Sequence, residues 1–535
     1  MFRWMYGLRG LAFLGAGLLW ASLPSLDLWP LAWIAPVPWI VLIRRQTLDD
    51  RRPYTILWLA GFAFWLGALH WLRLPHWATS FGWIALSAYF ACYLPLFVGL
   101  SRVAAHRLSI PVMLAAPMVW TGLELARAHV LTGMSMASIA HTQHRWLGLI
   151  QVSDLAGEYG VTFLLIFAAA AIARMLPCDG QRRVFWPPLP AAILIAAALF
   201  YGHFRMAGTA SKPGPQMALI QGSIDVTMQY DPRMRERMFR EYYELSRAAV
   251  AKNKNLDLVV WPESMFGEPL ITFDSDAKKP AAYPGSEEEF RQWLRQFQQH
   301  DRSTLAETAR LLGVPILVGV DAHHFCREGE RAFNAAMYVG REGQRLGRYD
   351  KMHLVMFGEY VPLADHFPWL QALTPLPTSA RPGERPVAFP IGHVRVAPNI
   401  CYETVLSHVI RGQVNALAAA GQEPDILVNL TNDGWFWGSS ELDMHLVCGV
   451  FRAVECRKPL LIAANTGFSA WIDGNGRIVE KGPRRAAGTI VARPEIDDRQ
   501  SWYLRHGDWF SGICLAGCGL FGLAGLWRRK SGGTP

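Results

Sequence analysis

The sequence is poor in charged residues, and those it has are unevenly distributed. Charged side chains occupy 18% of the 535 positions, whereas a soluble globular chain usually carries about 25%. Residues 1–203 contain 14 arginines, seven acidic residues and no lysine. Hydrophobic residues make up 51% of the chain. These proportions exclude a disordered chain, a collagen-like chain and a single soluble domain.

The sequence also lacks the signatures of several ligand-binding proteins. Eight cysteines in a chain of this length exclude a small scaffold held together by disulfides. No glycine-rich phosphate-binding loop is present. The histidine pairs His141/His144 and His323/His324 come without the further ligands that a zinc site requires. We therefore expect neither a metal nor a cofactor.

Apolar runs fill the first 205 residues, and one more lies near the C-terminus. The eight runs are Leu8–Leu23, Leu28–Ile43, Ile56–Trp71, Trp83–Leu100, Ile110–Ala126, Val161–Leu176, Pro188–Phe204 and Phe510–Trp527. Several are shorter than the roughly 20 residues that cross a bilayer. Their tryptophan-rich ends are nevertheless typical of side chains at the headgroup level. We therefore expect a membrane α-helical bundle of about eight spans.

The basic residues between the runs predict the orientation of the chain. If the N-terminus is cytoplasmic, 14 basic residues lie in inside segments and only Arg73, Arg127 and Arg145 lie in the short outside loops. This asymmetry follows the positive-inside rule, so the net charge of +9 reflects topology and not nucleic-acid binding. We expect a seven-span domain at 1–205, an extracytoplasmic domain at 206–505, and a final span with its tail at 506–535. Both termini are then cytoplasmic.

The segment 206–505 has the pattern of an α/β sandwich, in which short apolar runs alternate with polar helical stretches. The expected strands are Met217–Gln221, Leu258–Pro262, Pro315–Val320, Ala335–Val339, Val394–Ile400, Ile426–Leu430, Leu460–Ala464, Phe468–Ile472 and Thr489–Ala492. The expected helices are Arg235–Asn253, Ser303–Leu312, Val405–Ala420 and Leu442–Lys458. Residues 272–286 and 374–387 read as surface loops, and residues 472–478 as a hairpin with Asn-Gly at its turn.

Three residues that can carry chemistry lie in short motifs that end or follow strands. Glu263 stands in Trp-Pro-Glu-Ser, Lys351 in Tyr-Asp-Lys-Met-His, and Cys401 in Asn-Ile-Cys-Tyr-Glu. A thiol needs a base or a positive neighbour to act near neutral pH, and a carboxylate and an amine supply both. The backbone N–H of Tyr402 is a candidate donor to an oxyanion. Spacing alone leaves open whether these residues are catalytic or structural.

These motifs resemble the Glu-Lys-Cys set of the nitrilase (carbon–nitrogen hydrolase) superfamily, whose fold is a four-layer αββα sandwich. The order of spans and sandwich resembles the apolipoprotein N-acyltransferase family over essentially the whole chain. The resemblance makes Glu263 the general base, Lys351 the electrostatic partner and Cys401 the nucleophile. It also implies supporting or substrate-binding roles for Asn334, Glu359, Tyr402, Glu403, Trp435 and Phe436.

The resemblance implies a two-step acyl transfer at a bacterial plasma (inner) membrane. A phospholipid would donate a fatty acyl chain to Cys401, and the diacylglyceryl-modified N-terminal cysteine of a lipoprotein would accept it on its α-amino group. We expect a monomer. Two alternatives remain open from the sequence. One is a membrane-tethered amidase or nitrilase that hydrolyses its thioester, and the other is a non-catalytic membrane binding protein with a nitrilase-like domain.

Three apolar segments near these motifs are candidates to bind the acyl chain. They are Leu363–Pro377, Trp435–Trp437 and Met265–Phe266. Each is equally well explained as ordinary core packing.

Overall fold

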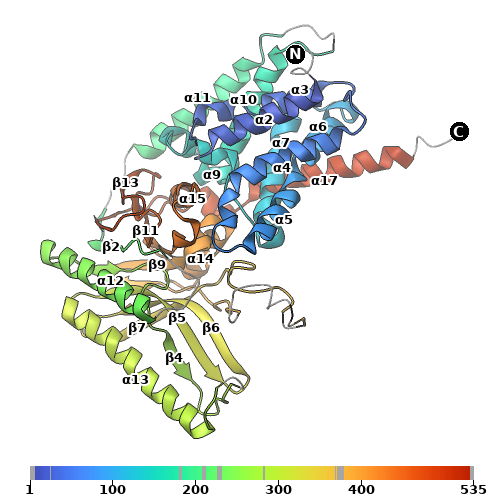
Figure 1. The fold of residues 1–535 in the computed structure, drawn as a ribbon. Coiled ribbons are helices and arrows are strands. Elements are labelled where there is room, and N and C mark those ends of the chain that lie inside the picture. Colours follow the sequence, from blue (N-terminus) through green and yellow to red (C-terminus); the bar gives the residue numbers. More distant parts are fainter. Residues whose placement is uncertain are drawn as a thin grey trace. The chain divides into compact units, whose positions relative to one another are not determined.

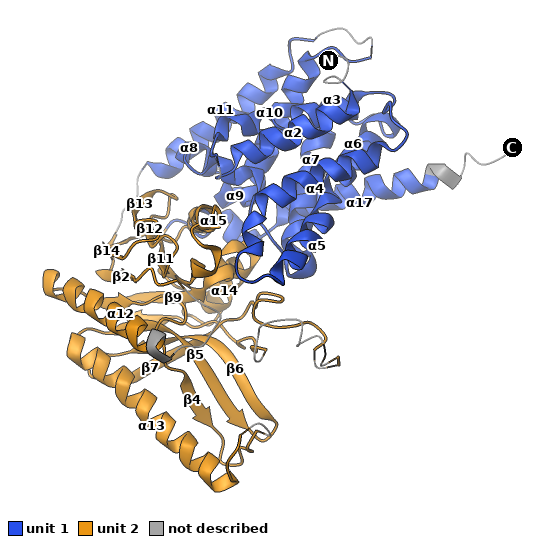
Figure 2. Cartoon of the chain, in the orientation of Figure 1, with its two compact units in different colours: residues 1–209, 454–456, 499–535 blue, residues 210–453, 457–498 orange. Residues whose placement is uncertain are grey.

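The computed structural model divides the chain into two compact units, which are coloured separately in Figure 2. Unit 1 contains residues 1–209, 454–456 and 499–535, and unit 2 contains residues 210–453 and 457–498. The structure describes residues 7–24, 26–179, 184–207, 212–225, 232–280, 283–364, 366–367, 369 and 379–530.

Unit 1 is helical (Figure 1). Apolar sequences with few charges form its helices, because a backbone surrounded by lipid must satisfy its own hydrogen bonds. Its principal helices are α2 (Leu8–Ser22), α3 (Val37–Arg44), α4 (Pro53–Ala68), α5 (Thr79–Ala91), α6 (Tyr93–Arg102), α7 (Val112–His129), α10 (Glu158–Met175), α11 (Pro188–Met206) and α17 (Trp509–Lys530). Short helices α8 (Leu147–Ile150), α9 (Ser153–Ala156) and α16 (Trp502–His506) connect them.

Four helical segments in the described part of the chain are long and apolar enough to cross a membrane. They are Thr79–Arg107, Glu158–Met175, Pro188–Met206 and Trp509–Trp527. The other expected spans correspond to shorter apolar helices or, in α7, to a helix that carries Glu124 and Arg127. The apolar helical segment Leu147–Ala156 was not expected from the sequence. The described residues therefore contain four candidate spans, and the expected number of about eight stays a prediction.

Helices α7 and α17 approach each other closely at Gly122. A Cβ atom at this position would lie 2.8 Å from the backbone of Cys514. Cys514 and Cys518 are buried in α17, and the Cys518 thiol donates to the carbonyl of Val119 at 3.6 Å. Small residues permit such close packing of helices in membranes, so Gly122 sets the distance between α7 and α17.

We expect Gly122→Ala to lower the thermal-unfolding midpoint of the detergent-solubilised protein, because the added methyl group has no room against backbone atoms. A cost of about 1–3 kcal/mol is typical of overpacking. Gly512→Ala, also at a glycine of unit 1, is the matched control, because a Cβ there meets no atom within 4 Å. Equal midpoints for the two variants would contradict this account of the helix contact.

Unit 2 contains two large β-sheets. The seven-stranded sheet has the order β14-β2-β3-β5-β6-β7, with β4 paired to β5. Its strands are β2 (Met217–Gln221), β3 (Leu258–Val260), β4 (Leu270–Phe273), β5 (Ile316–Cys326), β6 (Gly329–Val339), β7 (Arg345–Asp350) and β14 (Gly488–Ala492). The six-stranded sheet has the order β13-β12-β11-β10-β9-β8. Its strands are β8 (Phe389–Ile391), β9 (Val394–Ile400), β10 (Ile426–Thr431), β11 (Leu460–Ala464), β12 (Ala470–Ile472) and β13 (Ile478–Lys481). Short strands β1 (Lys212–Pro213) and β15 (Glu495–Ile496) pair separately.

The two sheets share one hydrophobic core, to which Leu219 and Val260 contribute from one sheet and Val396 and Val428 from the other. A second core forms where α12 (Pro232–Lys252) and α13 (Glu287–Leu312) cover the opposite face of the seven-stranded sheet (Figure 1). The helices α14 (Ser407–Ala419) and α15 (Glu441–Cys456) follow β9 and β10. Strands buried on both faces explain the near-continuous apolar runs of the sequence.

The structure corrects two expectations for unit 2. The expected helix Ser303–Leu312 is the end of α13, which begins 16 residues earlier at Glu287. The side chain of Ser286 accepts from the N–H of Glu289, whose carboxylate accepts from the N–H of Ser286, and Gly313 ends the helix in a left-handed conformation. Because the first turns of α13 are rich in polar residues, the start of this helix was not predicted from the sequence. The expected loop 272–286 also overlaps the end of β4.

Candidate active site

Glu263, Lys351 and Cys401 each follow the end of a strand in unit 2. Glu263 follows β3, Lys351 follows β7, and Cys401 follows β9. Trp261, which stands before Glu263, is fixed by burial. Its indole is completely buried and donates to the hydroxyl of Ser246 at 2.8 Å. Rigid strands therefore hold the three side chains.

A hydrogen-bonded network joins Glu263, Lys351, Glu359 and Asn334. The Lys351 ammonium group lies 2.9 Å from Oε1 of Glu359 and 3.4 Å from Oε1 of Glu263. The amide of Asn334 donates to the same two oxygens at 3.0 and 2.6 Å. Lys351 is 1% exposed. A buried ammonium group between two carboxylates satisfies the usual requirement that buried charges are paired.

The electrostatics of this network shift the pKa values of its two carboxylates in opposite directions. Burial raises the pKa of Glu263, and the negative Glu359 adds to this effect, although Lys351 opposes it. Burial also favours neutral Glu359, but Lys351 outweighs it and holds the pKa of Glu359 below its usual value. Burial likewise lowers the pKa of Lys351, but Glu359 and Glu263 outweigh it and raise that pKa above its usual value. Lys351 is thus a permanent cation, and Glu263 is the carboxylate with the greater proton affinity.

Cys401 begins a short 3-10 turn, Cys401–Val405, in a left-handed backbone conformation with φ +50°. Such strain in a non-glycine residue is typical of functional sites. Burial, and then the charge of Glu263, raise the pKa of the Cys401 thiol well above its usual value, whereas Lys351 lowers it. Cys401 therefore needs a base to become a thiolate. The charges of Glu263 and Lys351 both act on its sulfur.

Glu403 fixes the turn that carries Cys401. Its carboxylate accepts from the backbone N–H groups of Ile400 at 2.7 Å, Met352 at 2.8 Å and His353 at 3.0 Å. The hydroxyl of Tyr349 donates to both of its oxygens at 2.9 Å. Glu403 therefore links the end of β9 to the chain that follows Lys351.

We expect Glu403→Gln to destabilise unit 2. The amide NH₂ of glutamine, which donates, would replace a carboxylate oxygen that accepts from the surrounding N–H and O–H groups. The expected loss is about 2–3 kcal/mol in the free energy of unfolding, as for hydrogen bonds to a buried charge. Glu423→Gln is the control, since Glu423 pairs with Lys458 at 2.9 Å while half exposed and its loss should cost less than about 1 kcal/mol. Chemical denaturation followed by tryptophan fluorescence measures both, and equal midpoints would contradict the role of Glu403.

Sequence reasoning missed a buried cluster on the other side of Cys401. Asn429 donates to the Cys401 carbonyl at 3.1 Å, and Nε2 of His445 lies 3.2 Å from the same oxygen. Nδ1 of His445 lies 3.1 Å from Oδ1 of Asp433, to which the Thr431 hydroxyl also donates at 2.8 Å. A lone histidine in α15 carried no sequence signal for this cluster.

Among the described residues, Asp433, Glu441 and His445 form a group of potential metal ligands, with one ligand atom from each lying within 4.8 Å of the others. Asp433 and His445 already engage each other in this group. The histidines considered from the sequence have other partners: His141 contacts Glu158 at 2.9 Å, and His323 contacts Glu330 at 2.5 Å.

The remaining candidates from the sequence are Tyr402, Trp435 and Phe436. Tyr402 is half-buried beside the stacked ring of His353. Trp435 and Phe436 are half-buried in the short turn Asp433–Phe436 after β10. Nothing in their described contacts distinguishes a substrate-binding role from packing.

Two of the apolar segments proposed for the acyl chain can now be placed. Met265 and Phe266 are buried in the core with Trp261, so they do not form an acyl-binding surface. Within Leu363–Pro377, the described residues Phe367 and Trp369 are exposed. Residues 365, 368 and 370–377 of this segment lie outside the described residues.

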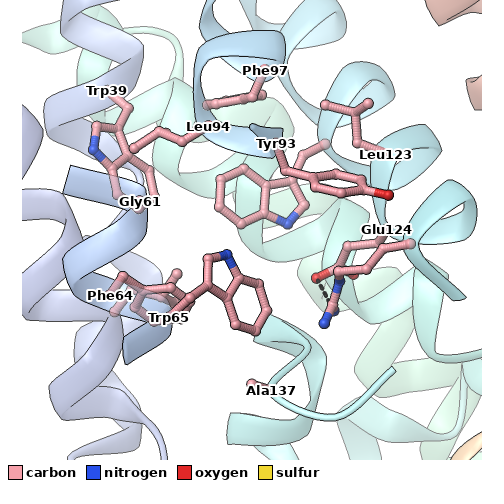
Figure 3. Close-up of a pocket in the computed structure, with 13 residues that line it drawn as sticks. Trp39, Gly61, Phe64, Trp65, Tyr93, Leu94, Phe97, Leu123, Glu124 and Ala137 are labelled. Atoms are coloured by element: carbon pink, nitrogen blue, oxygen red, sulfur yellow. Dashed lines mark ion pairs between the residues drawn. The ribbon is translucent and has the colours of Figure 1, made fainter. Parts of the chain in front are cut away.

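Unit 1 contains a separate aromatic-lined cavity of about 70 Å³ (Figure 3). At one end, Glu124 pairs with Arg127 at 3.8 Å and accepts from the Thr162 hydroxyl at 2.6 Å. Aromatic side chains, among them Trp39, Trp65 and Trp120, line the cavity.

Known proteins match both parts of the chain. Residues 15–171 match the sequence model of the apolipoprotein N-acyltransferase N-terminal domain, and residues 216–503 match that of carbon-nitrogen hydrolases. The apolipoprotein N-acyltransferase of Rhodopirellula baltica is 33% identical over 96% of this chain and 97% of its own. That of Geobacter metallireducens is 33% identical over 97% of this chain and 95% of its own. An amidase structure from Nesterenkonia sp. AN1 has a TM-score of 0.35 at 16% identity, covering 55% of this chain and 96% of its own. From the full-length matches, the chain belongs to the apolipoprotein N-acyltransferase family.

Proposed function

We propose that the protein transfers a fatty acyl chain from a membrane phospholipid, through a thioester on Cys401, to the α-amino group of the lipid-modified N-terminal cysteine of a lipoprotein. The observation that carries the proposal is the buried network of Glu263, Lys351, Glu359 and Asn334, in which the charges of Glu263 and Lys351 act on the Cys401 thiol. It occurs in a chain whose residues 15–171 match the N-terminal domain of apolipoprotein N-acyltransferases.

The first step forms the thioester. Glu263 accepts the thiol proton as the Cys401 sulfur attacks the ester carbonyl carbon of the phospholipid. Lys351 and the N–H of Tyr402 stabilise the resulting oxyanion. When the tetrahedral intermediate collapses, its bond to the glyceryl oxygen breaks. The lysophospholipid leaves with the proton from Glu263, and the acyl chain remains on sulfur.

The second step forms the amide. The neutral α-amine of the acceptor attacks the thioester carbonyl, and Glu263 accepts a proton from its nitrogen. The carbon–sulfur bond then breaks, and the thiolate recovers the proton from Glu263. An α-amine has a pKa near 8, so a useful fraction is neutral without strong activation. Water must be kept from the thioester between the two steps.

The membrane location follows from the substrates. Moving a 16-carbon chain into water would cost about 12 kcal/mol at about 0.8 kcal/mol per methylene. We therefore place the enzyme in a bacterial plasma membrane with eight spans and a four-layer αββα catalytic domain. Residues 206–505 would be extracytoplasmic between 1–205 and 506–535, with both termini cytoplasmic. It would act as a monomer on a phospholipid donor and a diacylglyceryl-modified lipoprotein acceptor.

The test is incubation of the purified protein with phosphatidylethanolamine and a diacylglyceryl lipopeptide, followed by mass spectrometry of peptide and protein. Acyl transfer gives an N-acylated lipopeptide and, without acceptor, one acyl chain on Cys401. Free fatty acid with unmodified lipopeptide would show a hydrolase and refute the proposal. Neither product would point to a non-catalytic binding protein.

The pH dependence of the first step should follow Glu263. Because burial raises the pKa of Glu263 above the usual 4.5, its carboxylate takes up a proton at a higher pH than that of an ordinary glutamate. Glu263 then no longer acts as a base. The rate of acyl-enzyme formation is therefore high above this raised pKa and falls as the pH decreases through it. Single-turnover rates across the pH range measure this limb. A rate that stays level down to pH 4.5, in protein that remains folded, would exclude Glu263 as the base.

A further inference from the structure

Two residues outside the set Glu263, Lys351 and Cys401 contact the carbonyl oxygen of Cys401. Asn429 approaches it at 3.1 Å and His445 at 3.2 Å, and both lie in the buried core of unit 2. This carbonyl belongs to the same peptide unit as the N–H of Tyr402. In a trans peptide the two groups point in opposite directions, and this bond is trans. Fixing the oxygen therefore fixes the direction of the N–H.

Both ring nitrogens of His445 face a fixed oxygen atom. Nδ1 lies 3.1 Å from a carboxylate oxygen of Asp433, and Nε2 lies 3.2 Å from the carbonyl oxygen of Cys401. The contact with Asp433 therefore fixes the orientation of the imidazole ring and directs Nε2 at the carbonyl.

A hydrogen bond to a peptide carbonyl also polarises the peptide and strengthens its N–H as a donor. Asn429 and His445 both contact the same carbonyl oxygen, so both act on the peptide unit that carries the Tyr402 N–H.

We propose that His445, held by Asp433, is a positioning residue that clamps the Cys401 carbonyl and thereby aims and strengthens the Tyr402 N–H as an oxyanion donor. The clamp also maintains the strained φ of +50° at Cys401. This inference rests on the proposed function, because it concerns the oxyanion formed in both steps of acyl transfer.

The test separates reactions of Cys401 that form an oxyanion from one that does not. Attack on a phospholipid ester forms an oxyanion, whereas alkylation by iodoacetamide displaces iodide directly. Full-length protein in phosphatidylethanolamine micelles is followed by mass spectrometry for acylation and alkylation of Cys401. We expect His445→Leu to slow acylation about 100-fold, as for loss of an oxyanion donor, and to leave alkylation within about twofold.

Two further variants keep the test decisive if His445→Leu does not fold. His445→Gln retains a donor that can reach the carbonyl only with poorer geometry, and we expect acylation to fall about tenfold. Asp433→Asn should act in the same direction, because it removes the carboxylate that orients the imidazole ring. The exposed His393→Gln is the control and should match the unchanged protein.

Three results would overturn the inference. They are acylation that is unchanged in the His445 variants, acylation and alkylation that fall equally, and a stoichiometric metal ion bound to Asp433 and His445 in the unchanged protein. A complete lack of acyl-enzyme in the unchanged protein would be different, because it would refute the proposed function itself.

Discussion

Cys401→Ala is expected to abolish both acyl-enzyme formation and transfer to the lipopeptide. Without the sulfur there is no nucleophile to divide the reaction into two steps, and removal of a nucleophile costs about 10⁴–10⁶ in rate. The variant should remain folded, because the side chain is small and its loss removes a hydrogen bond with the Thr431 side chain without leaving a charge unpaired. Mass spectrometry and a lipopeptide-acylation assay measure the two losses.

The matched control for this variant is Cys326→Ala. Cys326 is another cysteine of unit 2. It is buried, and its thiol donates to the carbonyl of Gly329 at 3.2 Å. It should leave both rates unchanged. Acyl transfer that persists in Cys401→Ala would remove the thioester from the mechanism and leave the family assignment without its proposed chemistry.

The sequence pointed to candidate reacting groups of the site but not to the residues that support them. Glu263, Lys351 and Cys401 stand in short motifs at strand ends, where the order of the chain already limits their position. His445 stands in no such motif and lies 44 residues from Cys401, near the start of α15. Its contact with the Cys401 carbonyl depends on how α15 packs against the strand ends, which no local pattern encodes.

The fold was predictable where the hydrophobic pattern was regular. The buried parallel strands β2, β3, β9, β10 and β11 were all expected within about two residues, as is usual for such boundaries. The long helix α13 was underestimated, because its first half is dominated by polar side chains and buries only Phe290 and Leu294. Met265 and Phe266 show the opposite difficulty, since an apolar pair beside a catalytic motif can line a site or fill a core.

Lys351→Met is the second change for which we expect a large effect, and it acts on rate and stability together. Removal of the ammonium group leaves Glu263 and Glu359 facing each other, both within hydrogen-bond reach of the Asn334 amide. Glu263, whose pKa is already raised, then takes up a proton and is lost as a base. With the oxyanion partner also gone, we expect acylation to slow at least about 10³-fold.

The loss of stability in Lys351→Met should be about 3–5 kcal/mol, because one partner of a buried ionic network is removed. Adding Glu359→Gln distinguishes the two effects, since it removes the carboxylate that is left unpaired. The double variant should recover much of the unfolding free energy in chemical denaturation while acylation stays as slow as in Lys351→Met. If acylation recovered together with stability, Lys351 would be a structural cation only, and the oxyanion would need another partner.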